Sequence, residues 1–456
     1  MPFYSQLEIK EVERDKVKKL RTTKGIQRLR EALLAQFSAK HTKSVKIATW
    51  NLREFGAGKY AGRDFECLYY IAEIISHFDI IALQEIRSDM REFNALRKIL
   101  GPDWSFIASD VTDGSAGNGE RMIFVYNRKT TFFRNVAGEL TLDDGEKIRA
   151  AFGERIKLEN GFELKLANSA ASLDGTYDAS LKSAGDKKKL AADLEVPIPD
   201  GSQLTLPSGV KLVLVKNTVV ESPGRGKATI TLPNKIEGEQ YRLRFLEDSL
   251  DDSFKQFART PYLISFQSGW LKINLCTVHI YYGNASDDDK LEQRRSEIEQ
   301  LTKALAKKAA SEYSLDGESF LGVLGDFNII GKGHPTMEAL ESNDFIIPDQ
   351  LKSIPGSNVA RDKAYDQIAF WKPKRVKEYA KLDILAGNTF DYFEHVFRLD
   401  QEGEYRNEAP QNGLKDTGTF NTWRTYKMSD HLPMWVELRS DFSDEYLAKI
   451  IKSEVS

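Results

Sequence analysis

Short apolar strands alternate with amphipathic helices over two long stretches of this chain. The first stretch predicts a strand at 45–50, a helix at 65–76 and another strand at 79–84, and the same pattern resumes at about residue 260. The alternation follows no strict strand–helix–strand repeat, which favours sheets stacked in layers with helices on their flanks. The sequence therefore predicts an α/β sandwich.

The alternation of strands and helices is interrupted in the middle of the chain, which divides the sequence into parts. With 456 residues, the sequence is longer than a single hydrophobic core usually supports. Residues 141–245 carry Gly, Asp and Lys clusters between short β-like runs and hold no motif, so we interpret them as a β-rich insertion. This insertion could restrict which nucleic acid fits or recruit a protein partner. The predicted parts are an N-terminal helical extension (1–44), a catalytic domain in two pieces (45–140 and 246–440), the insertion (141–245) and a C-terminal tail (441–456).

Composition excludes several classes of protein. Lysine and arginine number 65 against 68 acidic residues, a net charge of −3, so bulk positive charge cannot hold this chain on nucleic acid. Two cysteines cannot form a disulfide framework or a multi-cysteine zinc site. No apolar run reaches the length of a membrane span, and the N-terminus has no apolar signal core. We expect a cytoplasmic protein that does not associate with membranes.

Polar residues gather at the ends of the apolar strands. Loops converge at strand ends over a rigid sheet, so such residues often share one pocket. An oxygen-rich pocket suits Mg²⁺ and the metal-assisted hydrolysis of phosphate esters. The residues so placed are Asn51, Glu85, His279, Asp326, Asn328, Asp366, Asp430 and His431.

Each of these residues also has an ordinary structural explanation. Glu85 or Asp366 alone could be a capping or turn carboxylate, and the run 325–328 could be a common turn. Asp430 could cap or orient a surface histidine. The recurrence of polar residues at so many strand ends favours the functional interpretation.

Four motifs in order along the chain resemble the endonuclease/exonuclease/phosphatase superfamily. This resemblance covers roughly residues 45–140 and 246–440 and implies the deoxyribonuclease I-like fold, a four-layer α/β sandwich. Because the family includes nucleases, phosphatases, sphingomyelinases and deadenylases, the fold does not settle the substrate. The motifs are Trp50-Asn51, Leu83-Gln84-Glu85, Gly325-Asp326-Phe327-Asn328 and Ser429-Asp430-His431-Leu432-Pro433.

The resemblance implies a role for each motif residue. Glu85 resembles the main Mg²⁺ ligand, with Asn51 beside it and Asp366 in the same metal pocket. Mn²⁺ is the alternative ion. In the catalytic group, Asp326 would orient or deprotonate the attacking water, Asn328 would bind the scissile phosphate, Asp430 would orient His431, and His431 would bind phosphate or act as general base.

Further features favour a nuclease. The segment 119–126 resembles the deoxyribonuclease I stretch whose glutamate pairs with a general-acid histidine, and Glu120 and His279 match that pair. The stretch around Arg259 resembles one whose arginine contacts a DNA phosphate, and the run that includes Asp366 resembles another family segment. The signature of inositol phosphatases is absent.

Three hypotheses follow. The leading one is a Mg²⁺-dependent phosphodiesterase that acts on DNA as an endonuclease. The second is a phosphoinositide or other phosphomonoester phosphatase on the same fold. The third is a catalytically silent binding protein, which the intact acidic and histidine residues argue against.

Overall fold

The computed structural model of the protein describes residues 2–8, 15–37, 43–112, 119–142, 257–282, 288–316, 319–372 and 382–455, together with short strands between 148 and 255. The chain divides into two compact units. One unit comprises Met1–Thr141, Phe257–Tyr282 and Glu297–Ser456, and the other comprises Leu142–Gln256 and Gly283–Ser296.

The first unit contains two six-stranded sheets. The first sheet pairs β1 (Ser44–Phe55) with β2 (Ile80–Arg87) in parallel and with β21 (Met434–Arg439) in antiparallel fashion. The second sheet pairs β16 (Leu271–His279) with β17 (Ser319–Asp326) in parallel and β17 with β19 (Asp366–Trp371) in antiparallel fashion. In spatial order the first sheet consists of β20 (Ile384–Thr389), β21 (Met434–Arg439), β1 (Ser44–Phe55), β2 (Ile80–Arg87), β4 (Glu120–Asn127) and β3 (Trp104–Ala108). The second consists of β18 (Phe345–Ile346), β19 (Asp366–Trp371), β17 (Ser319–Asp326), β16 (Leu271–His279), β15 (Tyr262–Ser268) and β5 (Phe132–Glu139).

The two sheets pack face to face. The ring of Phe124 on β4 meets that of Phe266 on β15 edge-on, with centroids 5.6 Å apart. Gln84 Nε2 on β2 donates to Thr277 Oγ1 on β16 at 2.9 Å, so the interface also contains buried polar contacts. Aromatic pairs of this kind add to the stability that burial itself provides.

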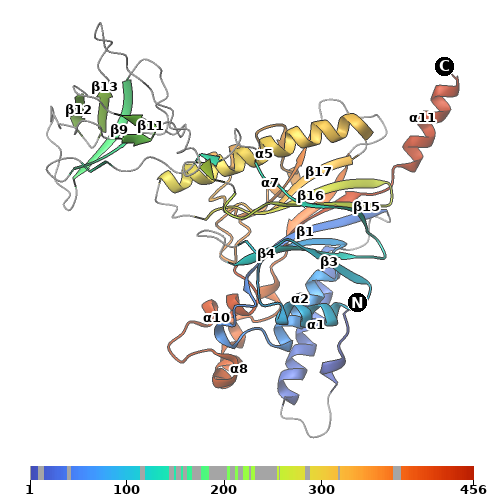
Figure 1. The fold of residues 1–456 in the computed structure, drawn as a ribbon. Coiled ribbons are helices and arrows are strands. Elements are labelled where there is room, and N and C mark those ends of the chain that lie inside the picture. The colour runs from blue at the N-terminus through green and yellow to red at the C-terminus, as the bar shows by residue number, and fades with distance from the viewer. Residues whose placement is uncertain are drawn as a thin grey trace. The chain divides into compact units, whose positions relative to one another are not determined.

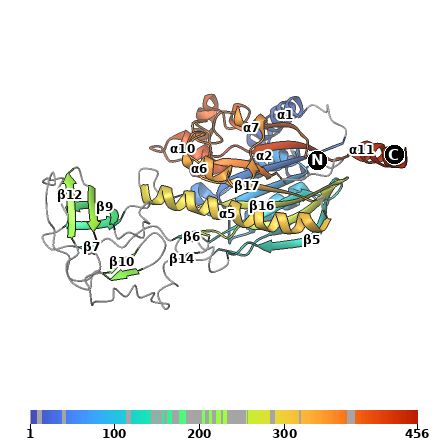
Figure 2. The same ribbon diagram turned by 90° about the horizontal axis from the view of Figure 1, so that it is seen from above.

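Helices cover the outer faces of both sheets, which gives the four layers that the resemblance implied (Figure 1). Helix α2 begins at the cap Asp64, whose side chain accepts from the Cys67 amide, and it is buried against the first sheet. Helix α5 (Asp288–Asp316) belongs to the first unit from Glu297 onward, and Figure 2 shows this part of the helix lying over β16 and β17. The α-helices are α1 (Lys16–Gln36), α2 (Phe65–Ile75), α3 (Arg91–Leu100), α5 (Asp288–Asp316), α6 (Pro335–Leu340), α7 (Asp349–Lys352), α8 (Glu402–Asn407), α9 (Ala409–Asn412), α10 (Phe420–Lys427) and α11 (Ser443–Val455), and the 3-10 turns are η1 (Ser5–Leu7), η2 (Lys59–Ala61), η5 (Tyr392–Glu394) and η6 (Leu399–Gln401).

One face of α5 is apolar and packs into the core. Ile298, Leu301 and Leu305 are fully buried on one face of this helix. Both cysteines, Cys67 and Cys276, are free and buried, where they pack as small hydrophobic residues. None of the described helices has the length and apolar character needed to cross a membrane.

The second unit contains a five-stranded antiparallel sheet, which confirms that the insertion is rich in β structure. This sheet has the order β12 (Val219–Gly224), β13 (Lys227–Thr231), β9 (Thr176–Ser183), β8 (Phe162–Leu166) and β7 (Ile156–Lys157). Two smaller pairs are β10 (Gln203–Thr205) with β11 (Lys211–Val213), and β14 (Phe254–Lys255) with β6 (Ile148–Arg149). The proposed partner-binding role of the insertion stays a prediction.

Candidate active site

Three predicted site residues lie side by side on the second sheet. In the strand register, His279 of β16 is paired with Asp326 of β17, and Asp326 is paired with Asp366 of β19. Directly paired residues on neighbouring strands project to the same face of a sheet. This row therefore points one imidazole and two carboxylates toward the opposing sheet.

The first sheet supplies the facing residues, Asn51 and Glu85. Both lie at irregular points of their strands, because the β1–β2 register shifts after Asn51 and Glu85 has a left-handed φ of 60°. Asn51 Nδ2 donates to Glu85 Oε1 at 2.9 Å and to Asp326 Oδ2 at 2.9 Å. One amide group thus connects the two sheets at the site.

The strand end that carries Asp326 and Asn328 requires a glycine. Gly325 has a φ of +147°, and a Cβ there would lie 2.1 Å from the Val278 carbonyl oxygen. Asn328 has a left-handed φ of 53°, and its Nδ2 donates to the Ile280 carbonyl at 2.8 Å. In this sharp turn the backbone N–H of Asn328 donates to Asp326 Oδ1 at 2.9 Å, which holds the carboxylate in place.

His431 forms a buried pair with Asp366. The distance between His431 Nδ1 and Asp366 Oδ2 is 2.8 Å. The same carboxylate oxygen accepts from the Ser357 hydroxyl at 2.7 Å, while the Ser357 oxygen accepts from the Asp366 amide at 2.8 Å. A carboxylate at Nδ1 holds a proton on that nitrogen and directs Nε2 away from the pair.

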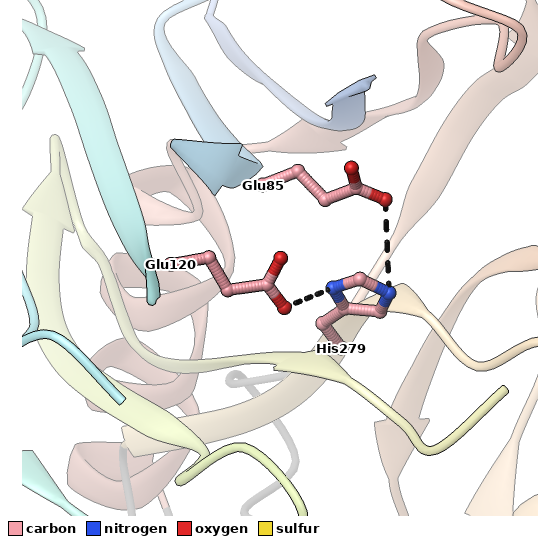
Figure 3. Close-up of side chains that lie close together, drawn as sticks. All are labelled: Glu85, Glu120 and His279. Atoms are coloured by element: carbon pink, nitrogen blue, oxygen red, sulfur yellow. Dashed lines mark ion pairs between the residues drawn. The ribbon is translucent and has the colours of Figure 1, made fainter. Parts of the chain in front are cut away.

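His279 forms a second pair, with Glu120 (Figure 3). Its Nδ1 lies 2.8 Å from Glu120 Oε1, and its Nε2 lies 3.9 Å from Glu85 Oε1. Arg259 is ion-paired with the same Glu120 carboxylate, and all three side chains are nearly inaccessible to solvent. The Glu120–His279 pairing expected from sequence is present.

Both histidine–carboxylate pairs point at Asp326. The distance from Asp326 Oδ2 to Nε2 of His279 is 3.7 Å, and that to Nε2 of His431 is also 3.7 Å. Neither distance is short enough for a hydrogen bond, so each Nε2 can interact with an oxygen of a substrate. The arrangement is an acidic centre between two oriented imidazoles.

Electrostatics keep this centre charged. Burial opposes ionisation of Asp326, but the imidazoles of His431 and His279 outweigh it and lower the pKa of this carboxyl. Burial also opposes protonation of both histidines, yet nearby carboxylates raise the pKa of His431 well above its usual range and raise that of His279. Asp326 thus carries negative charge at neutral pH, with proton donors on both sides.

Oxygen donors at the site fit a hard divalent cation. Glu85 Oε1 accepts from Asn51, and its Oε2 accepts from the Glu54 amide at 2.7 Å, which leaves further lone pairs on both oxygens. Mg²⁺ prefers one or two carboxylates together with water and phosphate oxygens. Glu85, with Asn51 beside it, is therefore the best candidate to hold the ion.

Asn51 could bind a metal ion through oxygen only if its side-chain amide were turned over. Its Oδ1 accepts from the Arg53 amide at 2.8 Å, and its Nδ2 faces the two carboxylates. Rotation of the amide by half a turn would direct oxygen toward Glu85 and Asp326, which is favourable only with a cation between them.

Two role expectations need correction. The resemblance implied that Asp430 orients His431, but Asp366 makes that contact. The side chain of Asp430 is 43% exposed and lies 3.4 Å from Arg53 Nη1. The charge of Asp430 still helps to raise the pKa of His431, but Asp366 is the carboxylate that contacts the imidazole.

Arg259 also differs from expectation. Sequence resemblance implied a contact with a DNA phosphate, yet only 6% of Arg259 is exposed and its guanidinium is bound to Glu120. Arg259 therefore helps to hold the Glu120 carboxylate beside His279.

Asp366 was expected among the metal ligands. Its Oδ2 is used by Ser357 and His431, while its buried Oδ1 has no hydrogen-bond partner among the described residues. Ligand atoms of Asp326, Asp366 and His431 lie within 4.8 Å of one another, as do those of Glu85, Glu120 and His279. A cation at the first of these clusters would compete with the Asp366–His431 contact, so metal binding by Asp366 stays a prediction.

Asp366→Asn should lower kcat by roughly 10²-fold or more, because an amide at Nδ1 favours the wrong tautomer of His431. Asp430→Asn should have an effect at least about tenfold smaller, since Asp430 does not touch the imidazole. Steady-state kinetics on both purified variants measure this difference. Equal losses would contradict the assignment of Asp366 as the orienting residue.

Sequence reasoning missed Ser357, and it quoted Ser429 only within a motif. Ser357 binds Asp366, and Ser429 Oγ donates to the Asn51 carbonyl at 2.6 Å and accepts from the His431 amide at 3.0 Å. A serine in a loop has no distinguishing pattern, so only the folded chain reveals the contact made by Ser357.

No family model matches the sequence, and no curated protein matches it. Solved structures similar to this chain include an endonuclease/exonuclease/phosphatase protein from Bacteroides vulgatus (12% identity, 87% of this chain and 99% of that one, TM-score 0.40) and a mannosyl-6-phosphatase from Bacteroides thetaiotaomicron (12%, 87% and 99%, 0.40). The human Nocturnin catalytic domain with bound sulfate is a third (12%, 87% and 94%, 0.37).

Proposed function

We propose that this protein is a Mg²⁺-dependent phosphodiesterase that cleaves DNA internally, with Mn²⁺ as the alternative ion. The observation that carries this proposal is the convergence of two histidine–carboxylate pairs on Asp326. Hydrolysis of a phosphate ester needs a base for water, donors for the phosphate oxygens and an acid for the leaving oxygen. Asp326 and the two histidines offer these groups in one pocket.

Each group then has a definite part in the reaction. Asp326, kept ionised by its neighbours, orients a water and accepts its proton. His431 donates from Nε2 to a phosphate oxygen, and His279, held by Glu120, supplies a proton to the leaving oxygen. A divalent cation held by Glu85 and Asn51 would neutralise charge on the phosphate oxygens.

The choice of DNA is supported by two features. The Glu120–His279 pair matches the deoxyribonuclease I-like motif found in the sequence. Two cations, Arg53 and Lys59, stand over the Tyr426 ring at 3.8 and 5.2 Å, and Arg53 reaches Asp430 beside His431. Cations next to the pocket suit a substrate with phosphates on both sides of the cleaved bond.

A substrate panel tests the proposal. The protein is incubated with Mg²⁺ and supercoiled plasmid, single-stranded DNA, RNA, abasic duplex or phosphoinositides. Conversion of supercoiled plasmid to nicked circles is the expected result, and His431→Ala, which removes an imidazole from the site, should abolish nicking. Release of inorganic phosphate without nicking would replace the endonuclease with the phosphatase hypothesis, and inactivity on the whole panel would leave only the binding-protein hypothesis.

A further inference from the structure

Glu297 is a buried carboxylate on α5 that none of the motifs includes. It is 1% exposed, on the buried side of a helix that also buries Arg294 and Ile298. Buried carboxylates are costly unless hydrogen bonds compensate them, so such a residue needs a structural or functional reason.

Both carboxylate oxygens bind backbone amides that flank the site. Glu297 Oε1 accepts from the Ala258 amide at 3.0 Å, and Oε2 accepts from the Tyr281 amide at 3.2 Å. Ala258 directly precedes Arg259, and Tyr281 lies two residues after His279. One side chain therefore joins the two chain segments that carry these residues.

The same two segments meet again at the Glu120–His279 pair. Arg259 is ion-paired with Glu120, and its Nη1 lies 3.5 Å from the Ile280 carbonyl oxygen. Glu120 in turn holds His279 Nδ1. The contacts form a closed circuit in which Glu297 sets the spacing between Arg259 and the end of β16.

We propose that Glu297 is a positioning residue that keeps the Glu120–His279 pair in its reactive geometry. This inference depends on the proposed phosphoesterase function of the site. Glu297 acts through the backbone of residues 258 and 281 and does not touch the substrate. Small displacements of a reacting group reduce rates strongly, which is why a residue behind the site can matter for turnover.

The substitution Glu297→Gln is the sharpest test. Glutamine keeps the shape, but its amide nitrogen faces one of the two backbone N–H groups, so at most one hydrogen bond survives. We expect kcat to fall roughly tenfold while KM changes less than about twofold, because substrate binding is not altered. Activity is measured on whichever substrate the wild-type protein cleaves.

A double-mutant cycle with His279→Ala separates positioning from general destabilisation. If Glu297 acts through His279, adding Glu297→Gln to the His279→Ala variant should cause no further loss of kcat. A similar loss in both backgrounds, or full activity of the single variant, would overturn the proposal. An inactive wild-type protein would instead refute the proposed function, so the two failures are distinguishable.

Glu73→Gln is the matched control. Glu73 is also 1% exposed and binds Arg30 at 2.9 Å, but it lies on α2, on the outer side of the first sheet. This variant should lower the melting temperature and leave kcat of the folded protein unchanged. If Glu73→Gln reduced kcat as strongly as Glu297→Gln, the effect of Glu297 would be one of stability alone and the proposal would fail.

Discussion

Replacing Asp326 with asparagine is expected to reduce kcat by at least roughly 10²-fold while the protein stays folded. Asp326 is 1% exposed, accepts from Asn51 and lies between two imidazoles, so its charge is the electrostatic centre of the site. An amide keeps the shape but loses both the negative charge and the ability to accept a proton from water. Steady-state hydrolysis of DNA, with circular dichroism to verify folding, measures the effect.

Asp349→Asn is the control for this variant. The side chain of Asp349 is 93% exposed on α7, and its substitution should leave activity unchanged. A folded Asp326→Asn protein that cleaves DNA at a near-normal rate would remove Asp326 from the mechanism.

Removal of divalent cations by a chelator is expected to reduce activity at least as strongly as the Asp326→Asn substitution does. Treatment with EDTA should abolish hydrolysis, and added Mg²⁺ or Mn²⁺ should restore it, because the acidic pocket has oxygen donors suited to a hard cation. Ca²⁺, which is larger and binds in less regular geometry, serves as a comparison ion. Full activity in the presence of chelator would exclude the metal-dependent mechanism.

Direct metal binding gives a second readout. Titration calorimetry should show weaker Mg²⁺ binding for Glu85→Gln than for the wild-type protein, since the variant loses a charged oxygen ligand. Unchanged affinity would mean that the ion is held elsewhere, for example at the cluster that contains Asp366.

The layered fold was predictable because the apolar residues that a strand or helix buries recur at regular intervals in the sequence. The strands around residues 45–50 and 79–84 and the helix at 65–76 were expected and are present as β1, β2 and α2. The positions of Asn51, Glu85, Asp326 and His431 at the ends of apolar runs were likewise visible in the sequence. Because loops converge at strand ends, residues there could be expected to share one pocket, and both sheets contribute to it.

Side-chain partners within the site were less predictable. The sequence neighbour Asp430 was expected to orient His431, but the fold brings Asp366, which is 65 residues away in sequence, to that imidazole. Arg259 resembled a surface phosphate contact and is instead buried against Glu120. Whether a side chain faces the pocket depends on local backbone twist and on strands that are distant in sequence.

By itself, then, the sequence determined the layered α/β architecture and the set of chemical groups that assemble at the site. Only the tertiary structure decided which carboxylate holds which imidazole, and that Glu297 joins the segments of Arg259 and His279. The physical reason is that burial patterns depend on each residue's own polarity, whereas hydrogen-bond partners depend on distances of a few ångströms between chain segments far apart in sequence.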